Sequence, residues 1–148
     1  MANYKKASVI VIAAATGTQS ISNAASAAAL QFTETSDQIN YATTATVFDG
    51  ETFTTPYTGF YQINFSLYWG GAAQTAGFVA IIKVSGFTTI ATLLNGAMGA
   101  GEIRNVSRVL RLVKGDQIRL YCAQTTGGAA TPTASGTTLS IIRIGNAS

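Results

Sequence analysis

The side chains of this sequence that could take part in catalysis are few and widely spaced. The chain has no histidine, the residue that most often serves as a general base or metal ligand near neutral pH. The one cysteine, Cys122, has no histidine to activate it, and the apolar residues around it are typical of a buried, inert thiol. The sequence therefore argues against an enzyme and predicts no cofactor.

The six acidic residues do not form a recognisable acid–base pair or set of metal ligands. Asp49 and Glu51 flank Gly50 and could supply oxygen atoms to a calcium ion, but two carboxylates are too few to specify such a site. A role in a turn or in contact with solvent is the favoured interpretation of this pair. We therefore predict no catalytic residue and no metal ligand.

The composition suits one domain that works in an assembly. A chain of 148 residues is long enough to bury a core of its own. Only 10% of the residues are charged, against about 25% in average chains, so little repulsion opposes close packing of several copies. No apolar run approaches the roughly 18 residues of a membrane-spanning helix, and we predict no membrane partner.

Positive charge is concentrated in the second half of the chain. Residues 1–82 carry two lysines and four acids, a net charge of −2, whereas residues 83–148 carry seven basic residues and two acids, a net charge of +5. These basic residues alternate along predicted strands and form no cluster with exposed aromatic residues, so we predict no nucleic-acid partner. They are interpreted as solvated or partner-facing sides of strands.

The apolar residues recur with the period of two that is typical of strands with one buried face. The clearest case is Tyr61–Trp69, in which every odd position is large and apolar and the even positions include Gln62, Asn64 and Ser66. The other predicted strands are Ala29–Thr35, Ala45–Phe48, Phe78–Val84, Thr89–Leu94, Ile103–Val113, Gln117–Gln124 and Thr138–Ile144. Many short strands with few helix signals predict an all-β jelly-roll sandwich.

Two of these strands are apolar on both faces, although a sandwich strand in a monomer needs only one buried face. Leu139 and Ile141 oppose Ile142 and Ile144 in the last strand. In strand 78–84, alternate positions are likewise apolar on both sides. We predict that four residues lie in an interface between identical copies: Ile142, Ile144, Val79 and Ile81. Cover by the chain's own N-terminal segment is the alternative.

The first 26 residues are predicted to form an extended arm, followed by the jelly-roll domain at residues 27–148. The arm is rich in alanine and serine and contains one short β-branched run. Two interpretations stay open, a mobile tail or a segment that attaches to a neighbouring protein. In the second, the predicted anchor comprises Tyr4, Lys5, Lys6, Val9 and Ile10.

Two motifs resemble the C1q and tumour-necrosis-factor-like family of trimeric jelly rolls. The first is Phe53-x-x-Pro56-x-x-Gly59-x-Tyr61, similar to the family's approach to a central strand, in which proline fixes the chain and glycine allows conformations that a side chain would forbid. The second is the hairpin 110–120, with a tight turn at Gly115-Asp116. The resemblance covers residues 27–145 and implies a homotrimer with a mostly apolar threefold axis.

The leading hypothesis is a non-enzymatic structural protein of a virion, a trimeric decoration or cement protein on the capsid surface of a bacteriophage. The major capsid protein would then be its partner. The alternative is a receptor- or glycan-binding head module of a phage fibre, or an extracellular or spore-surface protein that binds through loops 70–77 and 126–136.

Overall fold

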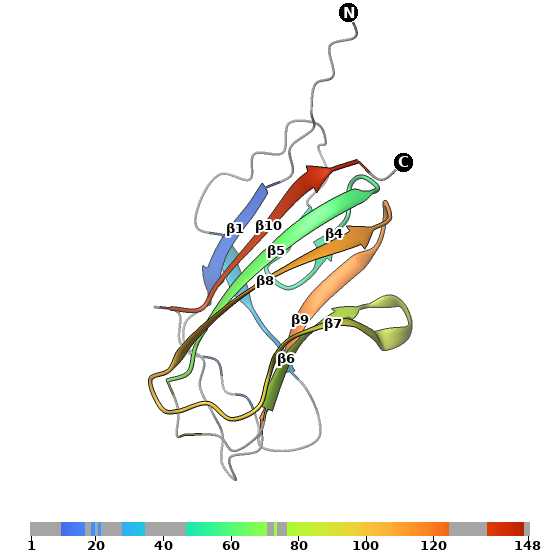
Figure 1. Cartoon of the computed structure of the whole chain (residues 1–148). Helices are drawn as coiled ribbons and strands as arrows, with labels where there is room; N and C mark the ends of the chain where they lie inside the picture. The colour runs from blue at the N-terminus through green and yellow to red at the C-terminus, as the bar shows by residue number, and fades with distance from the viewer. Residues whose placement is uncertain are drawn as a thin grey trace, which may run out of the picture.

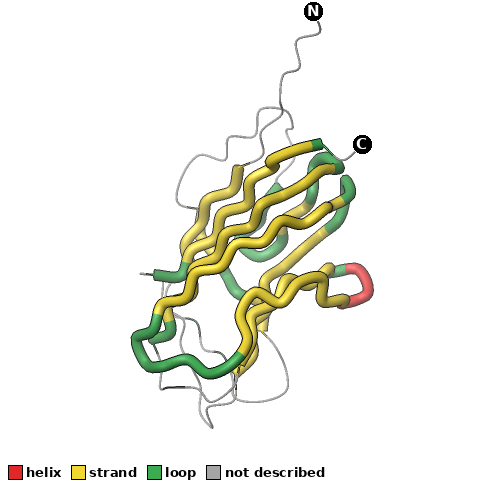
Figure 2. Tube along the Cα trace, in the orientation of Figure 1, coloured by secondary structure: helices red, strands yellow, loops and turns green. Residues whose placement is uncertain are grey.

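The computed structural model describes residues 10–16, 19, 21, 28–34, 47–70, 73, 77–124 and 136–146, which form a sandwich of two antiparallel sheets (Figure 1). Strands make up nearly all of the regular structure of these residues. They also include one short 3₁₀ turn, η1 (Ser85–Phe87), at the tip of a hairpin (Figure 2). The all-β sandwich expected from the sequence is confirmed.

The first sheet has five strands in the order β3-β1-β10-β5-β8. Their bounds are β1 Ile10–Ala15, β3 Phe32–Glu34, β5 Gly59–Tyr68, β8 Ile103–Leu112 and β10 Thr138–Gly145. The strands nearest the two ends of the chain, β1 and β10, are neighbours. Both therefore contribute to the same layer of the sandwich.

The second sheet has the order β2-β9-β6-β7, and β4 also pairs with β9. Their bounds are β2 Ala28–Ala29, β4 Phe53–Thr54, β6 Gly77–Lys83, β7 Thr88–Asn95 and β9 Gln117–Gln124. Predicted strand Ala29–Thr35 is thus divided between two strands. In the predicted strand Ala45–Phe48, Phe48 forms only an isolated bridge to Phe53, and residues 45–46 lie outside the described residues.

The core lies between the two sheets and follows from the alternation in β5. Tyr61, Ile63, Phe65 and Leu67 all point inward and are at most 2% exposed, whereas the residues between them are half-buried or exposed on the other face. Side chains of β6, β9 and β10 complete the same cluster. Burial of such side chains contributes roughly 1.5–3 kcal/mol each and is the main stabilising contribution to the fold.

The N-terminal segment is not wholly an arm, because Ile10–Ala15 forms strand β1 within the first sheet. β1 pairs with β10 on one side and with β3 on the other. Val11 and Ala13 are fully buried in the core. The predicted boundary at residue 26 therefore leaves one strand of the sandwich outside the domain, since a run of small and β-branched residues was too short to distinguish an arm from a strand.

Val79 and Ile81 lie in the core of their own chain rather than on its surface. Both are at most 1% exposed and belong to the central apolar cluster. The prediction that these two residues lie in an interface between copies was wrong. Alternation cannot reveal which face of a strand is buried in the core when both faces are apolar. Ala80 and Ile82, on the opposite face of β6, are buried as well.

The first sequence motif forms the approach to β5. The ring of Phe53 lies 5.7 Å from that of Tyr61, edge-on, and the Tyr61 hydroxyl donates a hydrogen bond to the Tyr57 carbonyl at 2.6 Å. Pro56 begins the turn between β4 and β5. Gly59 has no positive φ, so it is needed for the close approach of neighbouring atoms and not for an unusual backbone conformation.

The second motif forms the turn between β8 and β9. Gly115 has a φ of +89°, in the left-handed region that favours glycine. Asp116 Oδ2 accepts a hydrogen bond from the Val113 N–H at 3.0 Å, and Asp116 Oδ1 lies 2.7 Å from Lys83 Nζ on β6. The predicted tight turn is present, and its aspartate also ties the turn to the second sheet.

Candidate interaction surface

The face of the first sheet that points away from the core carries an unusual mixture of side chains. We call it the outer face, which comprises Ile12, Ala14, Thr33, Phe60, Gln62, Asn64, Ser66, Tyr68, Ile103, Asn105, Ser107, Val109, Arg111, Thr138, Ser140 and Ile142, with Ile144 exposed at the bulge at its margin. The strand register aligns Ile12, Ser140, Asn64 and Ser107 in one row across four strands. This face is therefore continuous from β1 to β8.

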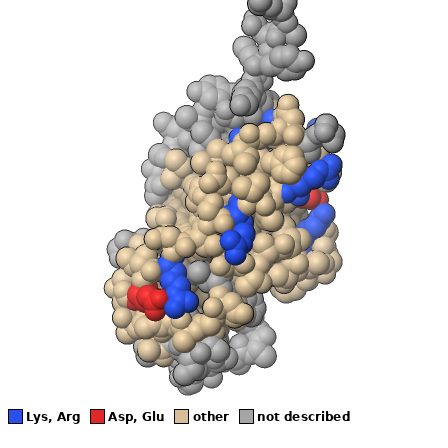
Figure 3. Space-filling model, in the orientation of Figure 1, with Lys and Arg blue, Asp and Glu red and all other residues tan. Residues whose placement is uncertain are grey.

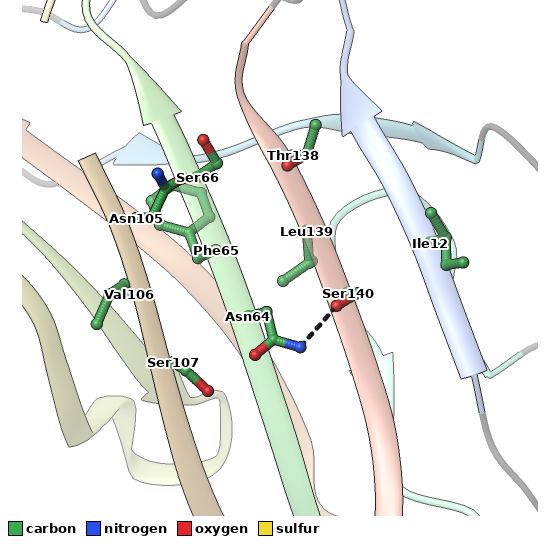
Figure 4. Close-up of a pocket in the computed structure, with 10 residues that line it drawn as sticks. All are labelled: Ile12, Asn64, Phe65, Ser66, Asn105, Val106, Ser107, Thr138, Leu139 and Ser140. Carbon is green, nitrogen blue, oxygen red and sulfur yellow. Dashed lines mark hydrogen bonds between the residues drawn. The ribbon is translucent and has the colours of Figure 1, made fainter. Parts of the chain in front are cut away.

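The polar side chains in the middle of the outer face bind one another. Gln62 Nε2 donates to Asn64 Oδ1 and to Ser107 Oγ, each at 3.2 Å. Asn64 Nδ2 donates to Ser140 Oγ at 3.0 Å, across β5 and β10 (Figure 4). Because these groups already have partners, covering them costs less than covering polar groups bonded only to water.

Apolar side chains occupy much of the rest of the outer face, and Arg111 lies opposite Phe60. Ile12 and Ile144 are each 44% exposed, Phe60 is 40% exposed and Val109 is 54% exposed. Ile142 lies beside them and is half-buried. The register of β10 against β5 shifts between Arg143 and Gly145, so Ile144 leaves the regular alternation of the strand.

A shallow groove of about 500 Å³ lies along this face. Ile12, Asn64, Ser66, Asn105, Ser107, Thr138 and Ser140 are among its lining residues, drawn from four strands (Figure 4). Its lining has hydroxyl, amide and aliphatic groups but no charged side chain. Such a groove suits a complementary protein surface better than a charged ligand.

Charged side chains are sparse over this part of the molecule. Figure 3 shows a broad area without them over β1, β10 and β5, and basic side chains gather along the β8 margin. The outward side chains of β10 and β5 are all uncharged. Depletion of charge with a central apolar area is typical of the buried part of protein interfaces.

The side chains that could take part in catalysis or metal binding have structural roles in this fold. Cys122 is buried, and burial raises the pKa of its thiol to about 12, so it stays protonated. Asp49 Oδ1 accepts hydrogen bonds from the N–H groups of Glu51 and Thr52, and the Glu51 carboxylate lies 2.6 Å from Arg119. Across the described ranges, no three metal-binding side chains come together, and no helix is long and apolar enough to span a membrane.

Of the predicted interface residues, Ile142 and Ile144 lie on the outer face, whereas Val79 and Ile81 lie in the core. Of the predicted anchor residues, Ile10 pairs with Ile142 inside the sheet. The remaining anchor residues Tyr4, Lys5, Lys6 and Val9 lie outside the described residues.

Sequence reasoning missed Ile12, Phe60 and Val109 as members of this surface. Phe60 had a detectable signal, because it is the one large apolar residue at an even position directly before the polar row of β5. Ile12 and Val109 could be placed only once the pairing of β1 and β8 was known.

No protein-family model matches this chain, and no curated protein matches it. Among solved structures, murine APRIL at pH 8.0 is 13% identical with a TM-score of 0.65, and the match covers 93% of this chain and 99% of that one. The Eiger TNF of S. frugiperda is 12% identical with a TM-score of 0.61, covering 97% of this chain and 96% of that one. The fold is thus a TNF-like jelly roll, as predicted.

Proposed function

We propose that this chain is a non-enzymatic building block that self-associates into a homotrimer through its outer face. The observation that carries the proposal is the exposed apolar group of Ile12, Phe60 and Ile144 around a row of polar side chains that are bonded to one another. The jelly-roll likeness to APRIL and Eiger TNF supports the proposal at the level of fold. The lack of histidine supports a role without catalysis.

The energetic gain from covering this face is large enough to matter. Ile12, Phe60 and Ile144 each leave about two-fifths of their surface exposed in the single chain. Complete burial of such side chains contributes roughly 1.5–3 kcal/mol each, so covering the exposed parts of three of them contributes roughly 2–4 kcal/mol per copy. That is a sizeable fraction of a typical domain stability of about 5–15 kcal/mol.

The more specific proposal is a decoration or cement protein on a bacteriophage capsid, with the major capsid protein as partner. The low content of charged residues and the compact single sandwich suit a small block that covers a surface. Residues Tyr4, Lys5, Lys6 and Val9 remain the proposed anchor to the capsid. Ile10 supports the anchor only indirectly, because it is part of β1.

Self-association is tested by light scattering coupled to gel filtration. The expected mass is three times that of the chain, and Phe60→Asp or the pair Ile142→Asp and Ile144→Asp should reduce it to that of one subunit. Phe87→Asp is the matched control, because Phe87 is still more exposed, at 62%, but lies on the turn between β6 and β7 of the other sheet. A wild-type protein that stays a folded single subunit at all concentrations would overturn the proposal.

The capsid role is tested by sedimentation with capsids that lack the protein. The test requires a phage in whose genome portal, protease and major capsid genes lie beside the gene for this chain. Co-sedimentation that saturates at a fixed number of copies per capsid is the expected result. Binding to glycans or to a host surface protein with no capsid binding would favour the alternative, a receptor-binding head module.

A further inference from the structure

The edges of the two sheets differ sharply in how open they are to another strand. Among the described residues, the edge strands β2 and β3 are two and three residues long. The edge strand β7 pairs with β6 through two register shifts, and such irregularities hinder further pairing. These three edges therefore have the features by which proteins protect exposed strand edges.

β8 is neither short nor interrupted by a register shift. It is ten residues long and pairs with β5 from Tyr68 and Ile103 to Gly59 and Leu112 without a register shift. Within the described part of the chain, no strand pairs with its other side, and it lies at the margin of the sheet in Figure 1. Only Leu112 of its ten residues is buried. A regular strand of this length can accept a further strand by backbone hydrogen bonding.

The side chains along β8 and the turn after it place exposed apolar and basic groups at this edge. Ile103 and Val109 are each 54% exposed, and β-branched residues favour pairing with another strand. Arg108 and Arg111 are exposed on the strand, and Lys114 is exposed in the turn that follows. The edge is thus both suited to strand pairing and strongly basic.

These three basic side chains have no carboxylate partner among the described residues, where the ion pairs involve other groups. Four of the chain's six acidic residues already have partners. Asp49 caps a turn, Glu51 pairs with Arg119, Glu102 with Arg104 and Asp116 with Lys83. The chain's own described carboxylates therefore leave the charge of the β8 edge unbalanced.

We infer that the β8 edge binds an extended acidic segment of a different protein as an added strand. Pairing of β8 with β8 of a second copy would bring arginines close to one another, and like charges on facing strands are destabilising. Arg108 and Arg111 are three positions apart and so project from opposite faces of the sheet. The partner strand should therefore carry two carboxylates three positions apart, one on each face.

The inference goes beyond self-association and can fail independently of it. The probe is a fluorescent ten-residue peptide of threonine and valine with two glutamates three positions apart. We expect saturable binding to the wild-type protein at low salt, weakened about tenfold by the double substitution Arg108→Gln and Arg111→Gln. Arg108→Lys with Arg111→Lys keeps the positive charge at the same two positions and should bind the peptide nearly as tightly as the wild type.

Two further peptides separate strand addition from simple charge attraction. A peptide N-methylated at every residue keeps its charge but has no backbone N–H to donate, and it should not bind. Binding of the unmodified peptide should also slow amide hydrogen exchange in β8, as strand pairing protects backbone N–H groups.

Equal binding of the methylated peptide would overturn the inference, as would binding of single-stranded DNA in preference to the acidic peptide. A loss of binding in the Arg108 and Arg111 variant counts only if gel filtration gives the same mass as the wild type. A changed mass with unchanged peptide affinity would contradict the edge assignment and point to a role of these arginines in self-association.

Discussion

Gly59 and Gly145 lie so close together that a Cβ atom built on Gly59 would stand 2.5 Å from the Gly145 carbonyl oxygen. The same Cβ would stand 2.8 Å from Nε of Arg143, whose Nη2 donates to the Thr58 carbonyl and whose guanidinium lies 5.2 Å from the centre of the Tyr57 ring. The start of β5 and the end of β10 are therefore joined at a point with no room for a methyl group.

Gly59→Ala is expected to lower the free energy of unfolding by about 1–3 kcal/mol, because a side chain forced into a filled site displaces its neighbours. Urea denaturation measures the change. Gly99→Ala is the matched control, since its Cβ would meet nothing closer than 3.6 Å, at Glu102. Equal stability of Gly59→Ala and wild type would show that the contact relaxes easily.

Phe87 has a φ of +48°, a conformation that costs a non-glycine residue about 1–2 kcal/mol. Its ring lies 5.0 Å from that of Tyr121, edge-on, and such pairs contribute about 0.5–1.5 kcal/mol. We expect Phe87→Ala to be less stable than wild type and Phe87→Gly to recover about 1 kcal/mol of that loss. A thermal melt of the two variants shows the order, and an alanine variant as stable as the glycine variant would contradict it.

The Cys122 thiol should make the protein less stable in alkaline solution. Its pKa rises from 9.0 to about 12 on burial, so in the range between these values the unfolded thiol ionises and the folded one does not. Its contribution to stability is thus complete below pH 9.0 and is lost as the pH rises toward about 12. The stability of Cys122→Ala should fall less steeply above pH 9 than that of the wild type.

The pair of Lys83 and Asp116 should show the opposite pH dependence. Partial burial by itself raises the pKa of Asp116, but the hydrogen bond and charge of Lys83 and the Val113 N–H outweigh it, so the pKa lies below 3.8. The ionised Asp116 therefore stabilises the fold above pH 3.8, and this contribution is lost as the pH falls through the pKa of Asp116 in the folded state.

Asp116→Asn can still accept a hydrogen bond from Val113 but has no charge to attract Lys83. We expect it to be less stable than wild type at pH 7 by about 1 kcal/mol or less, with the difference disappearing in strongly acidic solution. Guanidinium denaturation at a series of pH values tests this. A difference that persists at low pH would place the effect in packing and not in charge.

The sequence predicted the parts of this fold in which alternation is unambiguous. In β5 the odd positions are apolar and the even positions are mostly polar, so both the strand and its buried face could be assigned. β9 was predicted with its observed bounds, Gln117–Gln124. The turn at Gly115 followed from its residue types, since glycine adopts positive φ at little cost.

Assignments failed where the pattern carried no information about long-range pairing. β6 is apolar on both sides, so Val79 and Ile81 could be placed in the core only by knowing which sheet faces them. β1 is short and rich in alanine, and its inclusion in the sandwich depends on β10, more than 120 residues further along the chain. The outer face joins residues of four strands and is therefore a property of the register.

The position of β10 between β1 and β5 has a consequence for the nascent chain. β1 leaves the ribosome more than 120 residues before β10, the strand that covers one of its sides. At a synthesis rate of about 5–20 residues per second, β1 waits roughly 6–25 seconds for that partner. During this time the backbone groups on that side of β1 remain available to other strands, so translation speed and chaperone access should influence the yield of native protein.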